Sequence, residues 1–140
     1  MSERKQNKKI DKRAPVIVGV GDLVDRSKED GLNPQELLAK ACEHAIQDSG
    51  IKELSNHIDY VGVVRFTVDF LTATNQSNFQ YSNFPRTLAN KLNISAKNEV
   101  YAPMGGNSPQ VLLEDALVKI STGETDCALL SGGEALQTMI

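Results

Sequence analysis

Short apolar runs that alternate with amphipathic segments predict an α/β protein with a mainly parallel sheet. The runs short enough to be strands lie at residues 16–21, 58–66, 99–102 and 127–131. The segments with apolar residues at helical spacing lie at residues 34–50, 85–92 and 109–122. Strands and helices in this alternating order form a layered sheet with right-handed crossovers.

The first strand is predicted at residues 16–21, which read Val-Ile-Val-Gly-Val-Gly. A β-branched run without polar alternation is typical of a strand that is buried on both faces. The first helix is predicted at residues 34–50, with Asn33 as its N-cap and Pro34 at its first position. Glu36 lies three residues after the cap, so we expect a capping box.

The second strand is predicted at residues 58–66, and a polar stretch over residues 68–83 follows it. That stretch is long for a connection, which is typical of functional or mobile loops. Asn83 is the predicted cap of a short helix at residues 85–92. The aromatic residues near this stretch could line an acyl or partner surface, although ordinary loop packing is the simpler interpretation: Phe79, Tyr81 and Phe84.

The third strand, at residues 99–102, leads into a long helix at residues 109–122. Apolar residues cover a wide arc of this helix, so we expect it to be well buried. Gly123 ends it, and the fourth strand follows at residues 127–131. Four strands and two long helices do not cover both faces of an open parallel sheet, so we expect these residues to be part of a larger polypeptide.

The candidate functional site is the corner between the third strand and the long helix. Residues 101–110 read Tyr-Ala-Pro-Met-Gly-Gly-Asn-Ser-Pro-Gln. Two glycines allow a sharp turn and a close approach to a ligand, and either Asn107 or Ser108 can cap the helix through its side-chain oxygen. Free N–H groups and the helix dipole favour negative charge at such a corner. We therefore take four residues as candidate substrate-binding residues: Gly105, Gly106, Asn107 and Ser108.

Carboxylates follow two of the predicted strands. Glu134 follows the pair Gly132 and Gly133 and could belong to an active-site loop, but a structural role, accepting backbone N–H bonds, is the simpler interpretation. Asp22 and Asp25 follow the first strand at its carboxyl end, where α/β sheets place ligands. With no base or metal ligand beside them in the sequence, we expect them to be solvated loop carboxylates.

Size and charge limit the class of protein. The chain has 140 residues, enough for one domain, and no apolar run approaches the length of a membrane span. Residues 1–13 carry a net charge of +4, while the remainder carries −7. We expect a disordered basic tail at residues 1–13, a folded domain at residues 14–140, a cytoplasmic location, and no nucleic-acid surface on the acidic body.

The cysteine and histidine residues suggest neither a disulfide framework nor a metal site. Cys42 lies in the first predicted helix and Cys127 in the fourth strand, so we expect buried, reduced thiols. His44 and His57 do not have the spacing of metal ligands. We therefore expect no metal and no tightly bound cofactor.

Over residues 14–138 the order of these elements resembles the N-terminal portion of the thiolase superfamily. The likeness is closest to the branch of thiolase-like acetyl-CoA acetyltransferases that includes relatives of the sterol-carrier-protein thiolases. It rests on the segments Gly-Gly-Asn-Ser-Pro-Gln at residues 105–110 and Leu-Leu-Ser-Gly-Gly-Glu-Ala at residues 129–135, together with the order of the predicted elements. The resemblance implies a thiolase-like N-terminal half, here incomplete, in which the helix at residues 109–122 is a buried central helix.

The resemblance also implies an acyltransferase of lipid metabolism that takes a coenzyme A thioester as substrate or ligand. In the family a nucleophilic cysteine lies at the start of this buried helix, but the matching residue here is Gly106. The catalytic histidine, the second cysteine and much of the CoA pocket belong to the family's C-terminal half. We therefore expect no catalytic residue in this chain and no activity from it alone.

Three hypotheses follow about the function. In the first, the chain is the N-terminal segment of an acyl-CoA acyltransferase that needs the missing C-terminal half. In the second, it comes from a non-catalytic protein that binds acyl-CoA or a lipid. In the third, it acts by pairing with a partner chain, which includes a second copy in a homodimer. Gly106 favours the second hypothesis, because it supplies no nucleophile.

Overall fold

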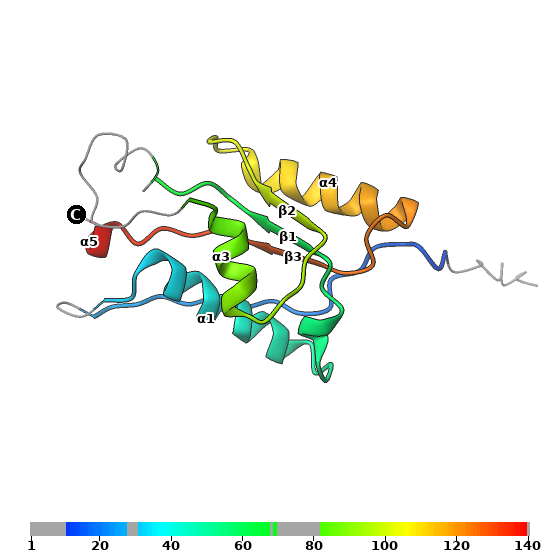
Figure 1. Cartoon of the computed structure of the whole chain (residues 1–140), viewed down its shortest axis with the longest axis horizontal. Coiled ribbons are helices and arrows are strands. Elements are labelled where there is room, and N and C mark those ends of the chain that lie inside the picture. Colours follow the sequence, from blue (N-terminus) through cyan, green and yellow to red (C-terminus); the bar gives the residue numbers. More distant parts are fainter. Residues whose placement is uncertain (1–10, 28–30, 68, 70–81, 140) are drawn as a thin grey trace, which may run out of the picture.

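A computed structural model describes residues 11–27, 31–67, 69 and 82–139. Its sheet has three strands: β1 (Tyr60–Val63), β2 (Asn98–Tyr101) and β3 (Ala128–Ser131). The strand order is β2-β1-β3, and both pairs are parallel (Figure 1). Tyr60 lies opposite Asn98 on one side and Ala128 on the other. The predicted fold class, α/β with a parallel sheet, is confirmed.

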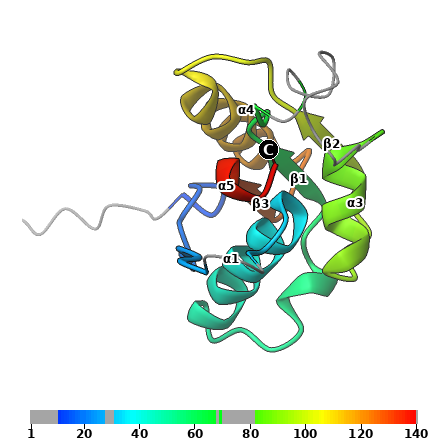
Figure 2. The same ribbon diagram turned by 90° about the vertical axis from the view of Figure 1, so that its left-hand side faces the viewer.

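Helices cover both faces of the sheet. Figure 2 shows α1 (Pro34–Asp48) and α3 (Phe84–Lys91) on one face and α4 (Ser108–Thr122) on the other. A single 3₁₀ turn, η1 (Leu54–Asn56), precedes β1, and α5 (Leu136–Met139) follows β3. The core lies between the sheet and the α1–α3 layer, where Phe66 stacks on Phe84 with ring centroids 4.8 Å apart. Phe84 is therefore a core residue, as the simpler interpretation of it predicts.

The caps of α1 and α3 are those that the sequence predicts. The Asn33 side chain accepts the Glu36 N–H at 2.9 Å, and the Glu36 carboxylate accepts the Asn33 N–H at 3.3 Å. The Asn83 side chain accepts the Arg86 N–H at 3.1 Å. Each helix therefore begins where its own residues satisfy the otherwise unpaired N–H groups of the first turn.

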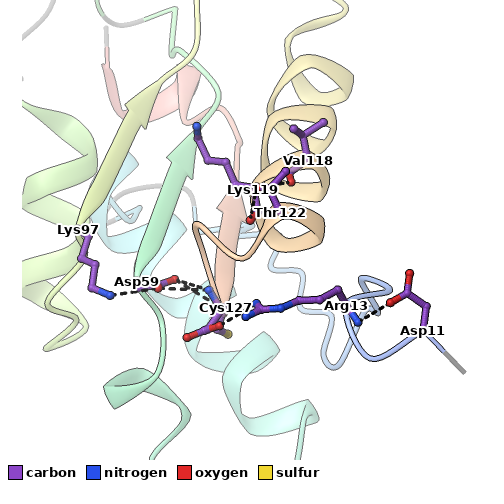
Figure 3. Close-up of polar contacts among 9 residues, drawn as sticks. Asp11, Arg13, Asp59, Lys97, Val118, Lys119, Thr122 and Cys127 are labelled. Atoms are coloured by element: carbon purple, nitrogen blue, oxygen red, sulfur yellow. Dashed lines mark hydrogen bonds and ion pairs between the residues drawn. The ribbon is translucent and has the colours of Figure 1, made fainter.

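One residue joins the amino ends of all three strands (Figure 3). The Asp59 N–H donates to the Cys127 carbonyl at 3.0 Å, and its own carbonyl accepts the N–H groups of Lys97 and Asn98. Its carboxylate accepts the N–H groups of Asp126 and Cys127 at 3.2 Å and lies 3.8 Å from Lys97 Nζ. The start of β1 is thus tied to the starts of β2 and β3.

The strand predicted at residues 16–21 is wrong. These residues pair with no strand, and Val16, Ile17 and Val20 are 76%, 80% and 67% exposed. The chain instead lies against α1, where a Cβ on Gly21 would clash with the Ala41 carbonyl oxygen. β-branched residues are exposed here because the described sheet has no strand beside this segment.

The long helix is less buried than its apolar arc predicts. In α4, Ser108, Leu112 and Ala116 are buried against the sheet, whereas Val111 and Val118 are 43% and 55% exposed. Tyr60 Oη donates to Asp115 at 2.7 Å and fixes the helix over β1. In the described part of the chain, α4 therefore buries one face only.

Several predictions fall on residues that the structure does not describe. These are most of the predicted tail, residues 1–10, and the aromatic residues Phe79 and Tyr81. At the start of the described chain, Arg13 pairs with Asp126 at 3.2 Å. No helix in the described ranges is long and apolar enough to cross a membrane.

Candidate functional site

A cavity of about 500 Å³ opens where the carboxyl ends of β1 and β3 meet the first turns of α4. Its apolar walls are Val64, Leu112 and Leu130, and its polar edge is formed by Arg65, Ser131 and Glu134. Pro109 lines it from the first turn of α4, and Gly132 and Gly133 from the loop after β3. Parallel sheets commonly bind ligands in this position.

Ser108 holds the predicted corner together, but it does not cap α4. Its hydroxyl donates to the Pro103 carbonyl at 2.5 Å, and its N–H donates to the Gly105 carbonyl at 3.0 Å. Asn107 occupies the N-cap position, yet its side chain makes no capping bond. The predicted side-chain cap is therefore wrong at both residues. Ser108 is 1% exposed, so burial drives its hydroxyl to the nearest backbone acceptor instead.

The two glycines of the corner lie in a tight turn that does not require glycine. Neither Gly105 nor Gly106 has a positive φ, so their backbone is open to any residue. A Cβ built on Gly106 meets no atom within 4 Å. The predicted sharp turn is present, but the backbone angles of these two residues do not need glycine, and Gly106 leaves open space at the start of α4.

The N-terminus of α4 offers unused hydrogen-bond donors. Within the described ranges, the N–H groups of Gly106 and Asn107 have no acceptor, and both residues are exposed. The helix dipole adds partial positive charge at this end. A ligand carbonyl or anion can therefore accept hydrogen bonds here.

The loop after β3 is fitted tightly to the loop after β1. A Cβ on Gly132 would lie 2.9 Å from Val64 Cβ, so no larger residue fits without a shift. Glu134 Oε1 accepts the Thr67 N–H at 3.0 Å and the Thr67 hydroxyl at 2.7 Å. The structural role predicted for Glu134 is confirmed, and this contact closes one side of the cavity.

Arg65 is a cavity residue that the sequence did not reveal. Its guanidinium carbon lies 4.4 Å from the centre of the Tyr101 ring, and its Nη1 pairs with Asp69 at 2.8 Å. Its Nε donates to the Ala102 carbonyl at 3.3 Å. Burial raises the pKa of Tyr101 to about 12, so that hydroxyl stays protonated beside the cation. An arginine at the end of an apolar run was the available signal, but two of its neighbours, Tyr101 and Ala102, come from the distant end of β2.

The two thiols are poor nucleophiles. Cys42 is 3% exposed, and burial raises its pKa to about 11, although the neighbouring Ser131 hydroxyl lowers it in part. Cys127 is half-buried, not fully buried as predicted, and burial raises its pKa too. Both cysteines are free, as expected. The described residues contain no cluster of side chains suited to a metal ion.

Asp25 organises its own loop and is not simply solvated. Its carboxylate accepts the N–H groups of Leu32 at 2.6 Å and Ser27 at 2.9 Å. These bonds lower the pKa of Asp25 to about 2. The Asp22 backbone carbonyl lies 2.9 Å from His44 Nδ1, and neither Asp22 nor Asp25 lines the cavity beside α4.

Comparison with known proteins relates this chain to two solved structures. No family model matches the sequence, and no curated protein matches it. A monomeric SCP2-thiolase-like protein type 1 from Mycobacterium smegmatis is 31% identical over 89% of this chain, with a TM-score of 0.72. AbyA1, a tetronic acid condensing enzyme, is 16% identical over 76% of this chain, with a TM-score of 0.58, a likeness of fold alone.

The chain spans only part of each of these proteins. It covers 24% of the Mycobacterium smegmatis protein and 28% of the condensing enzyme. The likeness to the Mycobacterium smegmatis protein supports a thiolase-like fold for this chain.

Proposed function

Because the chain has a thiolase-like fold, we propose that it is the N-terminal segment of a thiolase-like acyl-CoA acyltransferase, inactive without the remainder of that protein. The reaction class of this proposal is transfer of an acyl group from a coenzyme A thioester. The parent protein would complete both the CoA pocket and the catalytic residues.

The N-terminus of α4 beside the cavity is the observation that carries the proposal. The exposed N–H groups of Gly106 and Asn107 can donate to a thioester carbonyl oxygen, and they would stabilise the charge that develops there during acyl transfer. The apolar wall of Val64, Leu112 and Leu130 suits an aliphatic acyl group.

The described residues supply no nucleophile at this corner. Gly106 has no side chain, and the Ser108 hydroxyl donates to the Pro103 carbonyl. Cys42 is buried, and its pKa of about 11 leaves almost no thiolate at neutral pH. Acyl transfer in the parent protein would therefore be direct, or would use a nucleophile from another segment.

The same observation favours a second candidate function, acyl-thioester binding without an acyl-enzyme. The donors and the apolar wall are retained, whereas the position that the resemblance assigns to the nucleophile, Gly106, is open space. A protein of this kind binds CoA thioesters and resists thiol-blocking reagents.

The test begins by sequencing the coding DNA past codon 140, because that sequence defines the longer polypeptide to be expressed. Titration of that polypeptide with acetyl-CoA should show saturable binding, which a Gly106→Trp variant, filling the open space, should abolish. Met104→Trp is the matched control, because Met104 is also exposed in this corner. Saturable binding with turnover supports the acyltransferase, binding without turnover supports the second candidate, and no binding overturns both.

A Gly106→Cys variant of the longer polypeptide tests whether a thiol placed at this corner becomes acylated. Peptide mapping by mass spectrometry should find an acetyl group on the introduced thiol after exposure to acetyl-CoA, but none on Cys42 or Cys127. Gly106→Ala is the control, since it adds the Cβ without a thiol. An introduced thiol that stays unmodified, in a variant that still binds acetyl-CoA, would argue against a catalytic corner.

A further inference from the structure

A second, smaller cavity lies beside the cavity at α4. It measures about 240 Å³, and Glu134 lines both cavities, so the two are adjacent. Its walls come from the loop before α1, from Leu37 of α1, and from residues 134–138, which include most of α5. Figure 1 shows α5 at the same end of the molecule as the described part of that loop. Gly132 and Gly133, which have no side chains, line the first cavity up to this junction.

The polar groups that line the second cavity already have partners in the described structure. The Asp25 carboxylate accepts the N–H groups of Leu32 at 2.6 Å and Ser27 at 2.9 Å, and it accepts the Ser27 hydroxyl as well. Thr138 Oγ1 donates to the Leu32 carbonyl at 2.9 Å and joins α5 to the loop before α1. Glu134 is bound to the loop after β1, as described for the first cavity. A polar ligand would therefore have to compete with these bonds for a partner.

The rest of the lining of the second cavity is apolar. It comprises six aliphatic side chains: Leu23, Val24, Leu32, Leu37, Ala135 and Leu136. Val24 and Leu136 are 67% and 49% exposed. A hydrocarbon chain buries apolar surface of this kind without breaking a hydrogen bond, so it is the ligand chemistry that the lining favours.

The volume of the second cavity suits part of a ligand. Pockets that hold a whole small molecule usually measure about 300–1,000 Å³, a range that includes the first cavity but not the second. A ligand of the second cavity therefore extends into it from the first cavity, which lies beside the N-terminus of α4.

We propose that the second cavity binds the far end of a long acyl chain whose thioester lies at the corner of residues 105–108. This deepens the proposed function and rests on it, because the first cavity is proposed to hold the thioester end. The ligand class is a long-chain fatty acyl thioester, whereas a short acyl group such as acetyl reaches only the first cavity. Asp25 and Glu134 disfavour a chain that ends in a carboxylate, because like charges repel.

Chain length provides the first test. Binding of acetyl-CoA, octanoyl-CoA and dodecanoyl-CoA to the longer polypeptide is compared by calorimetric titration, below the concentration at which dodecanoyl-CoA forms micelles. Dodecanoyl-CoA should bind at least about tenfold more tightly than octanoyl-CoA, because its additional methylene groups enter the second cavity. Equal affinities for the two overturn the proposal.

A matched pair of substitutions assigns that gain to the second cavity. Leu136 and Ile51 are similarly exposed, at 49% and 45%, but only Leu136 lines the cavity. Leu136→Trp narrows the cavity and should weaken dodecanoyl-CoA binding at least about tenfold more than acetyl-CoA binding, whereas Ile51→Trp should weaken neither. Val24→Trp narrows the cavity from the loop before α1 and serves where Leu136→Trp does not fold. Dodecanoyl-CoA binding that the folded variants leave unchanged overturns the proposal.

Photolabelling locates the far end of the chain directly. A dodecanoyl-CoA analogue with a diazirine on its last carbon is bound to the longer polypeptide and irradiated, and the labelled peptides are mapped by mass spectrometry. The labels should fall within residues 23–37 and 135–138. Labels confined to other peptides overturn the proposal.

A Gly106→Trp variant separates this proposal from the proposed function. Labels that remain in the second cavity of this variant overturn the corner as the thioester site and leave the second cavity as a site for the chain. Acetyl-CoA binding that this variant abolishes, with no label in the second cavity of the parent protein, overturns only the second cavity.

Discussion

The hydroxyl of Ser108 shows how a single buried polar atom can position a binding corner. It satisfies the Pro103 carbonyl and thereby fixes the turn over residues 103–108 ahead of α4. A serine in a glycine-rich corner suggests either a cap or a nucleophile from sequence alone. The structure shows neither role, because a buried hydroxyl needs a hydrogen-bond acceptor and the Pro103 carbonyl in the turn supplies one.

Removing this hydroxyl should destabilise the protein. Ser108→Ala leaves the Pro103 carbonyl without its donor, and we expect a loss of about 1–2 kcal/mol in the free energy of unfolding, measured by urea denaturation. Ser121→Ala is the matched control, since Ser121 also donates to a backbone carbonyl in α4 but is exposed. Equal losses in the two variants would contradict the role given to Ser108.

Asp25 gives the stability a defined pH dependence. Its pKa is lowered from 3.8 to about 2 by hydrogen bonds from Leu32 and Ser27, so the folded state favours the charged carboxylate. The stabilisation is therefore complete above the unfolded pKa and is lost as the pH falls through about 2. Asp25→Asn should lower the thermal midpoint at about pH 6, and the gap to the parent protein should narrow between about pH 4 and pH 2.

The neighbouring carboxylate controls for a general charge effect. Asp22 contributes its backbone carbonyl, not its carboxylate, to His44. Asp22→Asn should therefore leave the midpoint unchanged across this pH range. A constant gap for Asp25→Asn down to about pH 2 would show that its carboxylate is not what holds the loop.

At the scale of elements, the helix caps could be predicted from the sequence, whereas the neighbours of each element in the fold could not. The Asn33–Glu36 capping box and the Asn83 cap depend on residues within one turn, so the sequence alone predicts them. Residues 16–21 have the composition of a buried strand, but burial depends on a neighbouring element that composition cannot specify. α4 likewise has apolar residues over a wide arc, and only the structure shows which face meets the sheet.

Two asparagines at helix N-termini test whether a side-chain capping bond stabilises the helix that it begins. The Asn33 side chain caps α1, whereas Asn107 occupies the same position in α4 without a capping bond. Asn33→Ala should cost about 0.5–2 kcal/mol in unfolding free energy, while Asn107→Ala should cost little. Urea denaturation measures both, and a larger loss for Asn107→Ala would contradict the assignment.

In the candidate site, the corner at residues 105–108 could be predicted from the sequence, whereas the residues that lie around it in the fold could not. Residues 105–108 are contiguous, so their glycines, serine and following proline are visible as a motif. Arg65 follows β1 and Tyr101 ends β2, and the two residues meet only because β1 and β2 are neighbours. The open space at Gly106 is likewise a property of the folded backbone and could not be predicted from the sequence.

At the scale of the whole molecule, Asp59 connects the three strands at their amino ends. Its side chain is 13% exposed and accepts two backbone N–H groups. Asp59→Ala should remove these charge-assisted bonds and lower the unfolding free energy by about 2–4 kcal/mol. Chemical denaturation followed by circular dichroism measures the loss.

An exposed acid at the same end of the sheet is the control for Asp59. The carboxylate of Asp126 pairs with Arg13 but is 79% exposed. Asp126→Ala should therefore cost well under about 1 kcal/mol, as exposed ion pairs do. Similar losses from the two variants would mean that general surface charge, and not the tie between strands, sets the stability.

The central position of β1 has a consequence for how the chain folds during synthesis. β1 is the first of the described strands to leave the ribosome, yet its partners begin 38 and 68 residues after Tyr60, at Asn98 and Ala128. This fully buried strand must therefore stay unpaired until residues 98–131 have been made, and closing such distant contacts is slow. We therefore expect chaperones to bind the nascent chain during that interval, and its yield in cells to change with translation speed across residues 64–131.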